Sequence, residues 1–139
     1  MQEVSFEEVL DQMLAKDSRY SRDAYHFVKD ALDHTQKLVN KNSQGKLRHV
    51  SGQELLEGIR DYAISEFGPM ALTVFEEWGI RNCQDFGEIV FNMVESKLLA
   101  KTEQDSRDDF MKGYDFDETF RKPFLPLQKA RPAVKPAVS

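Results

Sequence analysis

Three residues with metal-binding side chains, His26, Asp30 and His34, follow one another at intervals of four. Residues four apart share one face of a helix, so the two imidazoles and the carboxylate could together hold a metal ion. The sequence offers no obvious fourth ligand. The same positions lie opposite an apolar stripe, where a solvated helix face is the ordinary arrangement, so we predict neither a metal site nor a cofactor.

Carboxylates that could bind calcium or exchange protons are concentrated near the C-terminus. They are Glu103, Asp105, Asp108, Asp109, Asp115, Asp117 and Glu118. The stretch DSRDDFMKGYDFDE does not match the acids, central glycine and terminal glutamate of a calcium loop. The sequence also lacks the common nucleophile, dinucleotide and phosphate-binding motifs. We therefore predict a solvated acidic loop and no catalytic residue, and an enzyme that uses this region is the less favoured alternative.

The composition favours one compact domain, because the 139 residues are 40% apolar and 31% charged. No run approaches the roughly 20 apolar residues that cross a bilayer, and MQEVSFEEVL begins with acids where a signal peptide has bases. We therefore expect a cytoplasmic protein without membrane contact. Cys83 is the only cysteine, which excludes an internal disulfide and predicts a small buried residue.

Apolar residues at helical spacing predict five helices, which begin near residues 5, 21, 51, 69 and 82. Ser51 followed by Glu54 has the pattern of a capping box, and Asn82 or Asp85 is the candidate cap for the fifth helix. Gly79 suits a left-handed end of the fourth helix. The predicted inward-facing stripes include Leu38 and Met70.

The helix order predicts a mainly α fold, with two N-terminal helices packed on a three-helix unit like that of a winged helix-turn-helix. The segments LLAKT and GYDFDETF, on either side of the acidic loop, could form a small β wing. The alternative is a five-helix bundle covered by an irregular C-terminal strap. Four aromatic residues would then hold the strap: Phe110, Tyr114, Phe116 and Phe120.

We expect one helical domain over residues 1–120 and an extended tail over residues 121–139, which holds four of the five prolines. Charge follows the same division. Residues 1–50 carry eight acids and eight bases, residues 51–119 sixteen acids and six bases, and residues 120–139 five bases and no acid. Polyanions should therefore contact the tail. Its bases are Arg121, Lys122, Lys129, Arg131 and Lys135.

The outward face of the fifth helix argues against DNA recognition. Its residues are Gln84, Glu88, Phe91, Asn92 and Glu95. A DNA reader presents Lys or Arg to a duplex that carries one negative charge per about 1.7 Å. We therefore predict that duplex DNA does not bind the body and that this face contacts a protein partner, with Phe91 as its anchor. The alternatives are that C-terminal aromatic residues cover Phe91, and that the protein is a ribonucleoprotein accessory factor that binds RNA through its tail.

The phrases HVSGQELLEGIRDYAISEFGPMA, WGI, DFGEIVFNMVE, KTEQDSRDDF and YDF resemble those of a family of small bacterial conserved-hypothetical proteins. The likeness extends from about Phe6 to Pro126. It implies a single bacterial domain with an optional tail, and it brings no catalytic or binding residue. Charge and exposure together favour a non-enzymatic interaction or adaptor protein.

Overall fold

The fold is mainly α-helical, as predicted. The computed structural model describes residues 6–42, 50–99, 106–111 and 113–125. Five α-helices and several short helical turns follow one another along this part of the chain. They are α1 (Phe6–Lys16), α2 (Arg22–Asn42), α3 (Gly52–Phe67), η1 (Gly68–Met70), α4 (Ala71–Glu77), α5 (Cys83–Glu95), η2 (Arg107–Phe110), η3 (Asp117–Arg121) and η4 (Lys122–Phe124).

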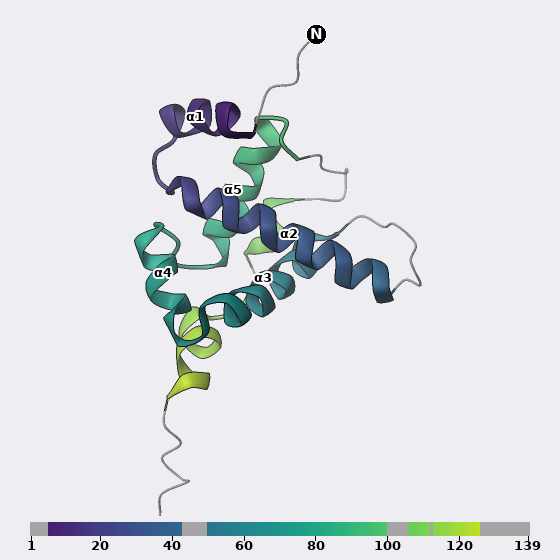
Figure 1. Cartoon of the computed structure of the whole chain (residues 1–139), viewed down its shortest axis with the longest axis vertical. Helices are drawn as coiled ribbons and strands as arrows, with labels where there is room; N and C mark the ends of the chain where they lie inside the picture. The colour runs from purple at the N-terminus through teal and green to yellow at the C-terminus, as the bar shows by residue number, and fades with distance from the viewer. Residues whose placement is uncertain (1–5, 43–49, 100–105, 112, 126–139) are drawn as a thin grey trace, which may run out of the picture.

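The longest helix, α2, crosses the middle of the molecule and packs along α3 (Figure 1). It also contacts α1 and α5. The helix α1 lies at one end of the long axis, and the turns η3 and η4 lie at the other end, where η3 contacts α3 and α4. The two ends of the described chain are therefore far apart.

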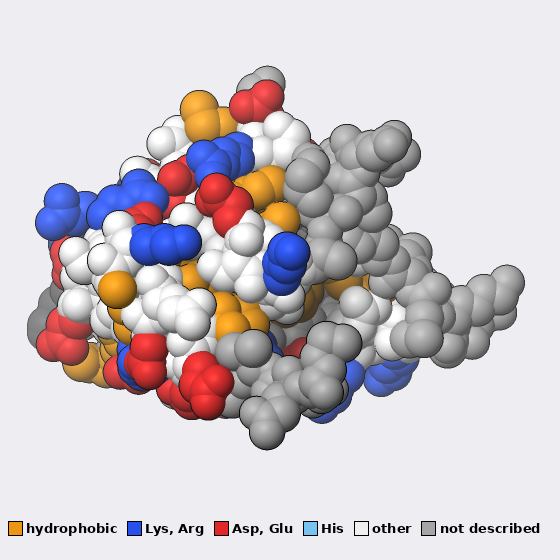
Figure 2. All heavy atoms as spheres, turned by 90° about the horizontal axis from the view of Figure 1, so that it is seen from above, with side chains coloured by type: hydrophobic (Ala, Val, Ile, Leu, Met, Phe, Trp, Pro, Cys, Tyr) orange, Lys and Arg blue, Asp and Glu red, His pale blue; other side chains and the backbone are white. Residues whose placement is uncertain are grey.

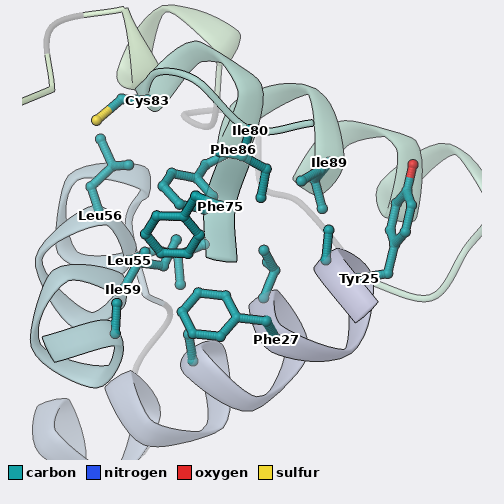
Figure 3. Packing of buried hydrophobic residues seen from close by; sticks show 14 of the residues in the cluster. Tyr25, Phe27, Leu55, Leu56, Ile59, Phe75, Ile80, Cys83, Phe86 and Ile89 are labelled. Atoms are coloured by element: carbon teal, nitrogen blue, oxygen red, sulfur yellow. The ribbon is translucent and has the colours of Figure 1, made fainter. Parts of the chain in front are cut away.

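Phe75 of α4 lies fully buried at the centre of an aromatic cluster. Its ring centroid is 5.4 Å from that of Phe27 on α2 and 5.3 Å from that of Phe86 on α5. A third neighbour is Phe120 on η3, at 5.2 Å. Figure 3 shows the rings of Phe27, Phe75 and Phe86 packed together, with Ile59 of α3 close by. One core therefore joins elements from the whole described chain.

The C-terminal part of the described chain packs on this core through aromatic rings. Phe110, Phe116 and Phe120 are buried, and the Tyr114 hydroxyl donates a hydrogen bond to the Leu56 carbonyl oxygen at 2.7 Å. Burial of such rings, each of about 150–250 Å², attaches this part of the described chain to the core.

The described part of the predicted β wing contains no strand. Residues 113–115 have no regular structure, and η3 is a single π-helical turn. Most of LLAKT, the other predicted strand, lies outside the described residues. The segment GYDFDETF alternates apolar and polar residues as a strand does, but its rings are buried in the core instead.

The chain remains helical from Arg121 to Phe124, where the extended tail was expected to begin. Pro123 stands at the start of a 3₁₀ turn, where its missing N–H costs nothing. Arg121 and Lys122 each pair with a carboxylate four residues earlier, which favours the helical turn. The prediction was therefore wrong for residues 121–124. The other three predicted tail bases lie outside the described residues: Lys129, Arg131 and Lys135.

Two side chains predicted to face inward lie at the surface. Leu38 is 42% exposed, because the inner stripe of α2 continues through Thr35 and Val39, which are both buried. Met70 is 56% exposed, because η1 ends there and the helical period restarts with α4. In contrast, Tyr25 was not predicted to be inward-facing and is fully buried.

Two glycines allow close approaches between backbone segments. A Cβ at Gly58 of α3 would lie 1.7 Å from the Thr35 hydroxyl oxygen on α2, so only glycine fits this helix crossing. Gly79 has a φ of 88°, the left-handed conformation predicted after α4. A Cβ at Gly79 would also lie 2.4 Å from the Arg19 carbonyl oxygen.

The predicted helix cap at Ser51 is confirmed, and of the two candidates for α5 it is Asn82 that caps the helix. The Ser51 hydroxyl oxygen accepts a hydrogen bond from the Glu54 N–H at 3.1 Å, and the Glu54 carboxylate accepts one from the Ser51 N–H at 3.0 Å. The Asn82 side-chain oxygen accepts from the Asp85 N–H at 3.1 Å. A second capping box, which was not predicted, starts η2 at Ser106 and pairs this residue with Asp109.

Replacement of the α3 cap tests this assignment. We expect Ser51→Ala to lower the free energy of unfolding by about 1 kcal/mol, because a helix donor loses its acceptor. Urea denaturation followed by circular dichroism measures the change. Ser65→Ala, at an exposed position inside α3, is the matched control and should cost nothing. Equal stability of both variants would show that Ser51 does not cap α3.

Candidate interaction site

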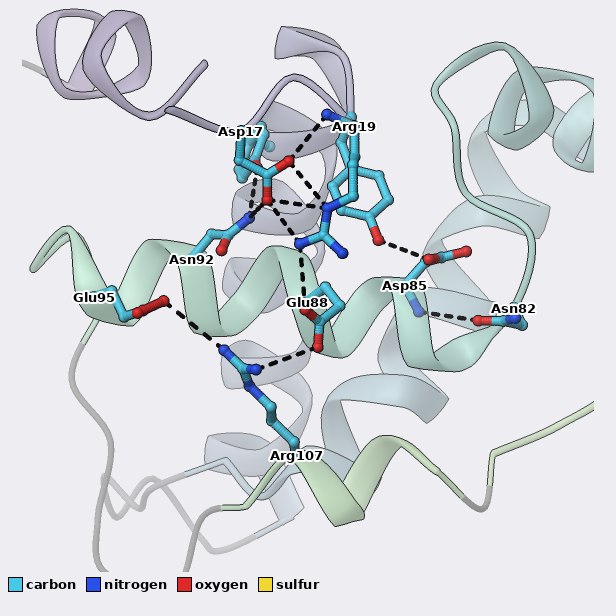
Figure 4. A network of polar contacts seen from close by, with 10 residues as sticks. Asp17, Arg19, Asn82, Asp85, Glu88, Asn92, Glu95 and Arg107 are labelled. Carbon is cyan, nitrogen blue, oxygen red and sulfur yellow. Dashed lines mark hydrogen bonds and ion pairs between the residues drawn. The ribbon is translucent and has the colours of Figure 1, made fainter. Parts of the chain in front are cut away.

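Arg19, in the turn between α1 and α2, links that turn to α5. Its guanidinium lies 2.7 Å from the Asp17 carboxylate and 3.3 Å from the Glu88 carboxylate (Figure 4). Asn92, one turn beyond Glu88, donates hydrogen bonds to the Asp17 carboxylate at 3.2 Å and to the Tyr25 hydroxyl at 3.0 Å. These charge-assisted bonds hold the α1–α2 turn on the outward face of α5.

Arg107 of η2 links a second segment to the same face of α5. Its guanidinium lies 3.6 Å from the Glu88 carboxylate and 3.8 Å from that of Glu95. It also lies over the Phe91 ring, 5.4 Å from the centroid. The Phe110 ring meets Phe91 edge-on at 6.4 Å between centroids. At this exposed position each contact is worth up to about 1 kcal/mol.

The five residues predicted to bind a partner do share one face of α5, but most are engaged within the chain. Arginines pair with Glu88 and Glu95, and Asn92 is hydrogen-bonded to the α1–α2 segment. Phe91 is half-buried, and Gln84 is exposed. A partner that bound this face would have to displace these contacts within the chain.

An apolar pocket with a volume of about 190 Å³ lies beside Phe91. Its walls come from α2, the start of α3, α5 and η2. We call it the apolar pocket and define it by its lining residues, Leu32, Gln36, Val50, Ser51, Gly52, Leu55, Val90, Phe91, Val94, Leu99, Ser106, Asp109 and Phe110.

The chemistry and size of the apolar pocket restrict what it can hold. Its lining is mainly apolar, and the polar side chains come from Gln36, Asp109 and two serines. Sites for small molecules usually measure roughly 300–1,000 Å³. A pocket of about 190 Å³ is therefore better suited to one large apolar side chain than to a cofactor.

The sequence pattern of α5 predicts an outward-facing Phe91 and gives no indication of the pocket next to it. The pocket joins segments that are distant in the sequence, as Leu32, Val50 and Phe110 illustrate. An apolar stripe describes a single helix, so it does not show which helices pack side by side. The sequence signal for the pocket was the width of the apolar stripes. Leu32 lies at the edge of the stripe on α2, and Val94 lies at the edge of the stripe on α5.

His26 and His34 are not brought together by the structure as metal ligands. The His26 ring nitrogen lies 2.8 Å from the Glu7 carboxylate on α1, and that of His34 lies 2.8 Å from the Asp61 carboxylate on α3. The face expected to be only solvated thus contacts both neighbouring helices. Within the described ranges, no group of three or more His, Cys, Asp or Glu side chains is arranged to hold a metal ion.

Cys83 is buried, as predicted, and lies beside the C-terminal segment. Its thiol is 3.5 Å from the Tyr114 carbonyl oxygen, and burial raises its pKa to about 11. Burial also raises the pKa of the Tyr114 hydroxyl. Tyr20, which donates to the Asp85 carboxylate at 2.6 Å, has its pKa raised by burial and by that bond. These groups stay protonated near neutral pH and are poor nucleophiles.

Charge is mixed on the surface near α1. Figure 2 shows Lys and Arg side chains interspersed with Asp and Glu on this face. A duplex reader needs local cations without adjacent carboxylates, which this face does not offer. None of the helices in the described ranges is long and apolar enough to span a bilayer.

No protein-family model, curated protein or solved structure matches the chain. The resemblance carried by HVSGQELLEGIRDYA therefore stays a prediction, and no residue role is transferred from another protein.

The Asp17–Arg19 pair predicts a pH dependence of stability. The Arg19 side chain lowers the pKa of Asp17 to about 2, from 3.8. A carboxylate with a lowered pKa stabilises the fold above the unfolded-state pKa, and this contribution is lost as the pH falls from about 4 to 2. We expect Asp17→Asn to cost roughly 1–2 kcal/mol at pH 7 and almost nothing at pH 2.

Denaturant titrations at several pH values measure this difference. Asp30→Asn is the control, because Asp30 is exposed on α2, and its cost should be small at every pH. A cost of Asp17→Asn that stays constant from pH 7 to pH 2 would contradict the assignment.

Cys83 should react slowly with thiol reagents in the folded protein. Since its pKa is raised from 9.0 to about 11, the thiolate fraction at pH 8 is reduced roughly 100-fold. The rate of reaction with a chromogenic disulfide, measured in buffer and in concentrated guanidinium chloride, gives the comparison. Equal rates in both solvents would show that the thiol is accessible.

Proposed function

We propose that this protein is a non-enzymatic interaction domain, which binds a segment of a partner protein by enclosing one side chain in the apolar pocket. The observation that carries this proposal is the pocket itself. Apolar walls from α2, α3 and α5 meet there, and half-buried Phe91 forms part of the lining. Buried anchors in such pockets supply much of the binding energy of protein interfaces.

The contacts around α5 favour the pocket as the docking site and disfavour the outer face of that helix. Glu88 and Asn92 already bind the α1–α2 segment, so a partner gains little from them. The pocket wall at Phe91 is braced from outside by Arg107 and from one side by Phe110. A braced wall reorganises little on binding, which favours affinity.

The alternative partner, RNA bound by the tail, is less well supported. Arg121 and Lys122 are paired with Asp117 and Glu118, so these two bases are partly neutralised. We also favour a helical bundle covered by the aromatic C-terminal segment over a winged helix-turn-helix, because GYDFDETF packs its rings into the core. Neither feature gives duplex DNA a place to bind.

Selection of peptides from a random 12-residue phage library on the full chain tests the proposal. We expect enriched peptides whose binding depends on the apolar pocket. Val94→Phe should weaken them at least roughly tenfold, because the added ring fills the pocket from its half-buried α5 wall. Fluorescence anisotropy with the synthetic peptides measures the dissociation constants.

Gln84→Phe is the matched control, since it adds the same ring to an exposed position of α5 that does not line the pocket. Peptide binding should survive this change. Circular dichroism establishes that both variants fold. Enriched peptides that bind Val94→Phe as tightly as the unchanged protein would overturn the proposal.

A further inference from the structure

Building on the proposed function, we infer that the partner segment presents one large apolar side chain flanked by Lys or Arg, and that Asp109 selects for those basic residues. The pocket's size sets the first requirement, since about 190 Å³ accommodates one large side chain. The Asp109 carboxylate in its lining sets the second.

Among the described residues that line the apolar pocket, Asp109 is the one with a charged side chain. Asp108 precedes it and is exposed. Both belong to the span of residues 51–119, in which acids outnumber bases sixteen to six. A basic residue beside the anchor would meet the Asp109 carboxylate, whereas an acidic one would be repelled.

The nearest arginine in the sequence, Arg107, pairs with carboxylates other than that of Asp109. Its guanidinium is directed across α5 to Glu88 and Glu95, and it lies over the Phe91 ring. Arg107 is therefore engaged on the outer side of the pocket wall. Asp109, two residues later, faces the pocket side of η2.

The Asp109 carboxylate is held in place before any partner arrives. One of its oxygens accepts a hydrogen bond from the Ser106 N–H at 3.2 Å, and its backbone carbonyl oxygen accepts from the Gln53 side chain at 2.8 Å. Its side chain also packs beside Gly52, where a Cβ would lie 2.6 Å from the Asp109 Cβ. A carboxylate has several acceptor positions, so capacity for a partner remains.

Polar groups around the pocket suit the backbone of an extended peptide. Ser51 and Ser106 line the pocket together with its apolar residues, and each hydroxyl oxygen accepts a helix-cap bond while its O–H can still donate. A few polar side chains around an apolar site orient a bound segment. The anchor, the flanking base and the peptide backbone therefore each have a matching group.

Two acetylated and amidated octapeptides test this inference on the full chain. Both have a central phenylalanine, and they differ only in the flanking residues, which are lysines in one and glutamates in the other. Titrations followed by methyl NMR of Leu55, Val90 and Val94 report binding in the pocket. We expect the lysine peptide to bind roughly tenfold more tightly at low salt.

Asp109→Asn should remove most of this preference, because the amide keeps an oxygen for the Ser106 N–H but loses the charge. Asp115→Asn is the matched control. Asp115 likewise accepts a backbone hydrogen bond, from the Glu118 N–H at 3.0 Å, and it does not line the apolar pocket. This control should leave the preference for lysine unchanged.

The outcomes separate the inference from the proposed function. Equal binding of both peptides, tighter binding of the glutamate peptide, or a preference that persists in Asp109→Asn would overturn the inference about charge and leave the pocket as a docking site. If neither octapeptide moves the pocket methyl signals, the inference also fails. The phage-selected peptides then decide the proposed function separately, through their sensitivity to Val94→Phe.

Discussion

The described structure depends on the packing of aromatic rings around Phe75. This ring contacts Phe27 of α2, Phe86 of α5 and Phe120 of η3, so one side chain joins three segments that are far apart in sequence. The helix that carries it, α4, has only seven residues and could not persist alone in water. Its stability comes from the core that it organises. The C-terminal turn that carries Phe120 is part of the same core.

Around this core, the polar contacts place the secondary elements. Arg19 and Arg107 approach Glu88 from two sides, so one carboxylate on α5 joins the α1–α2 turn to η2. Exposed ion pairs contribute little free energy individually, but here they determine which segments cover α5. Glu88 and Glu95, whose charges argue against DNA recognition, therefore also hold neighbouring segments on α5.

Local features of the fold could be predicted from the sequence, and contacts between distant segments could not. The caps at Ser51 and Asn82 and the left-handed Gly79 depend on residues within one helical turn, and they were predicted correctly. The apolar pocket and the Arg107 contacts depend on how separate segments meet, and no local pattern encodes that. The proposed docking site therefore adjoins the face predicted around Phe91, but it is a pocket that the sequence did not predict.

The close approach of Gly58 and Thr35 has a consequence for recognition. Thr35 lies beside Leu32 and Gln36 in α2, and Gly58 lies one turn beyond Leu55 in α3, so the crossing adjoins two walls of the apolar pocket. Any larger residue at Gly58 would push the two helices apart and widen the opening. A residue that has no side chain and does not line the pocket would thus set the size of the side chain that the proposed docking site admits.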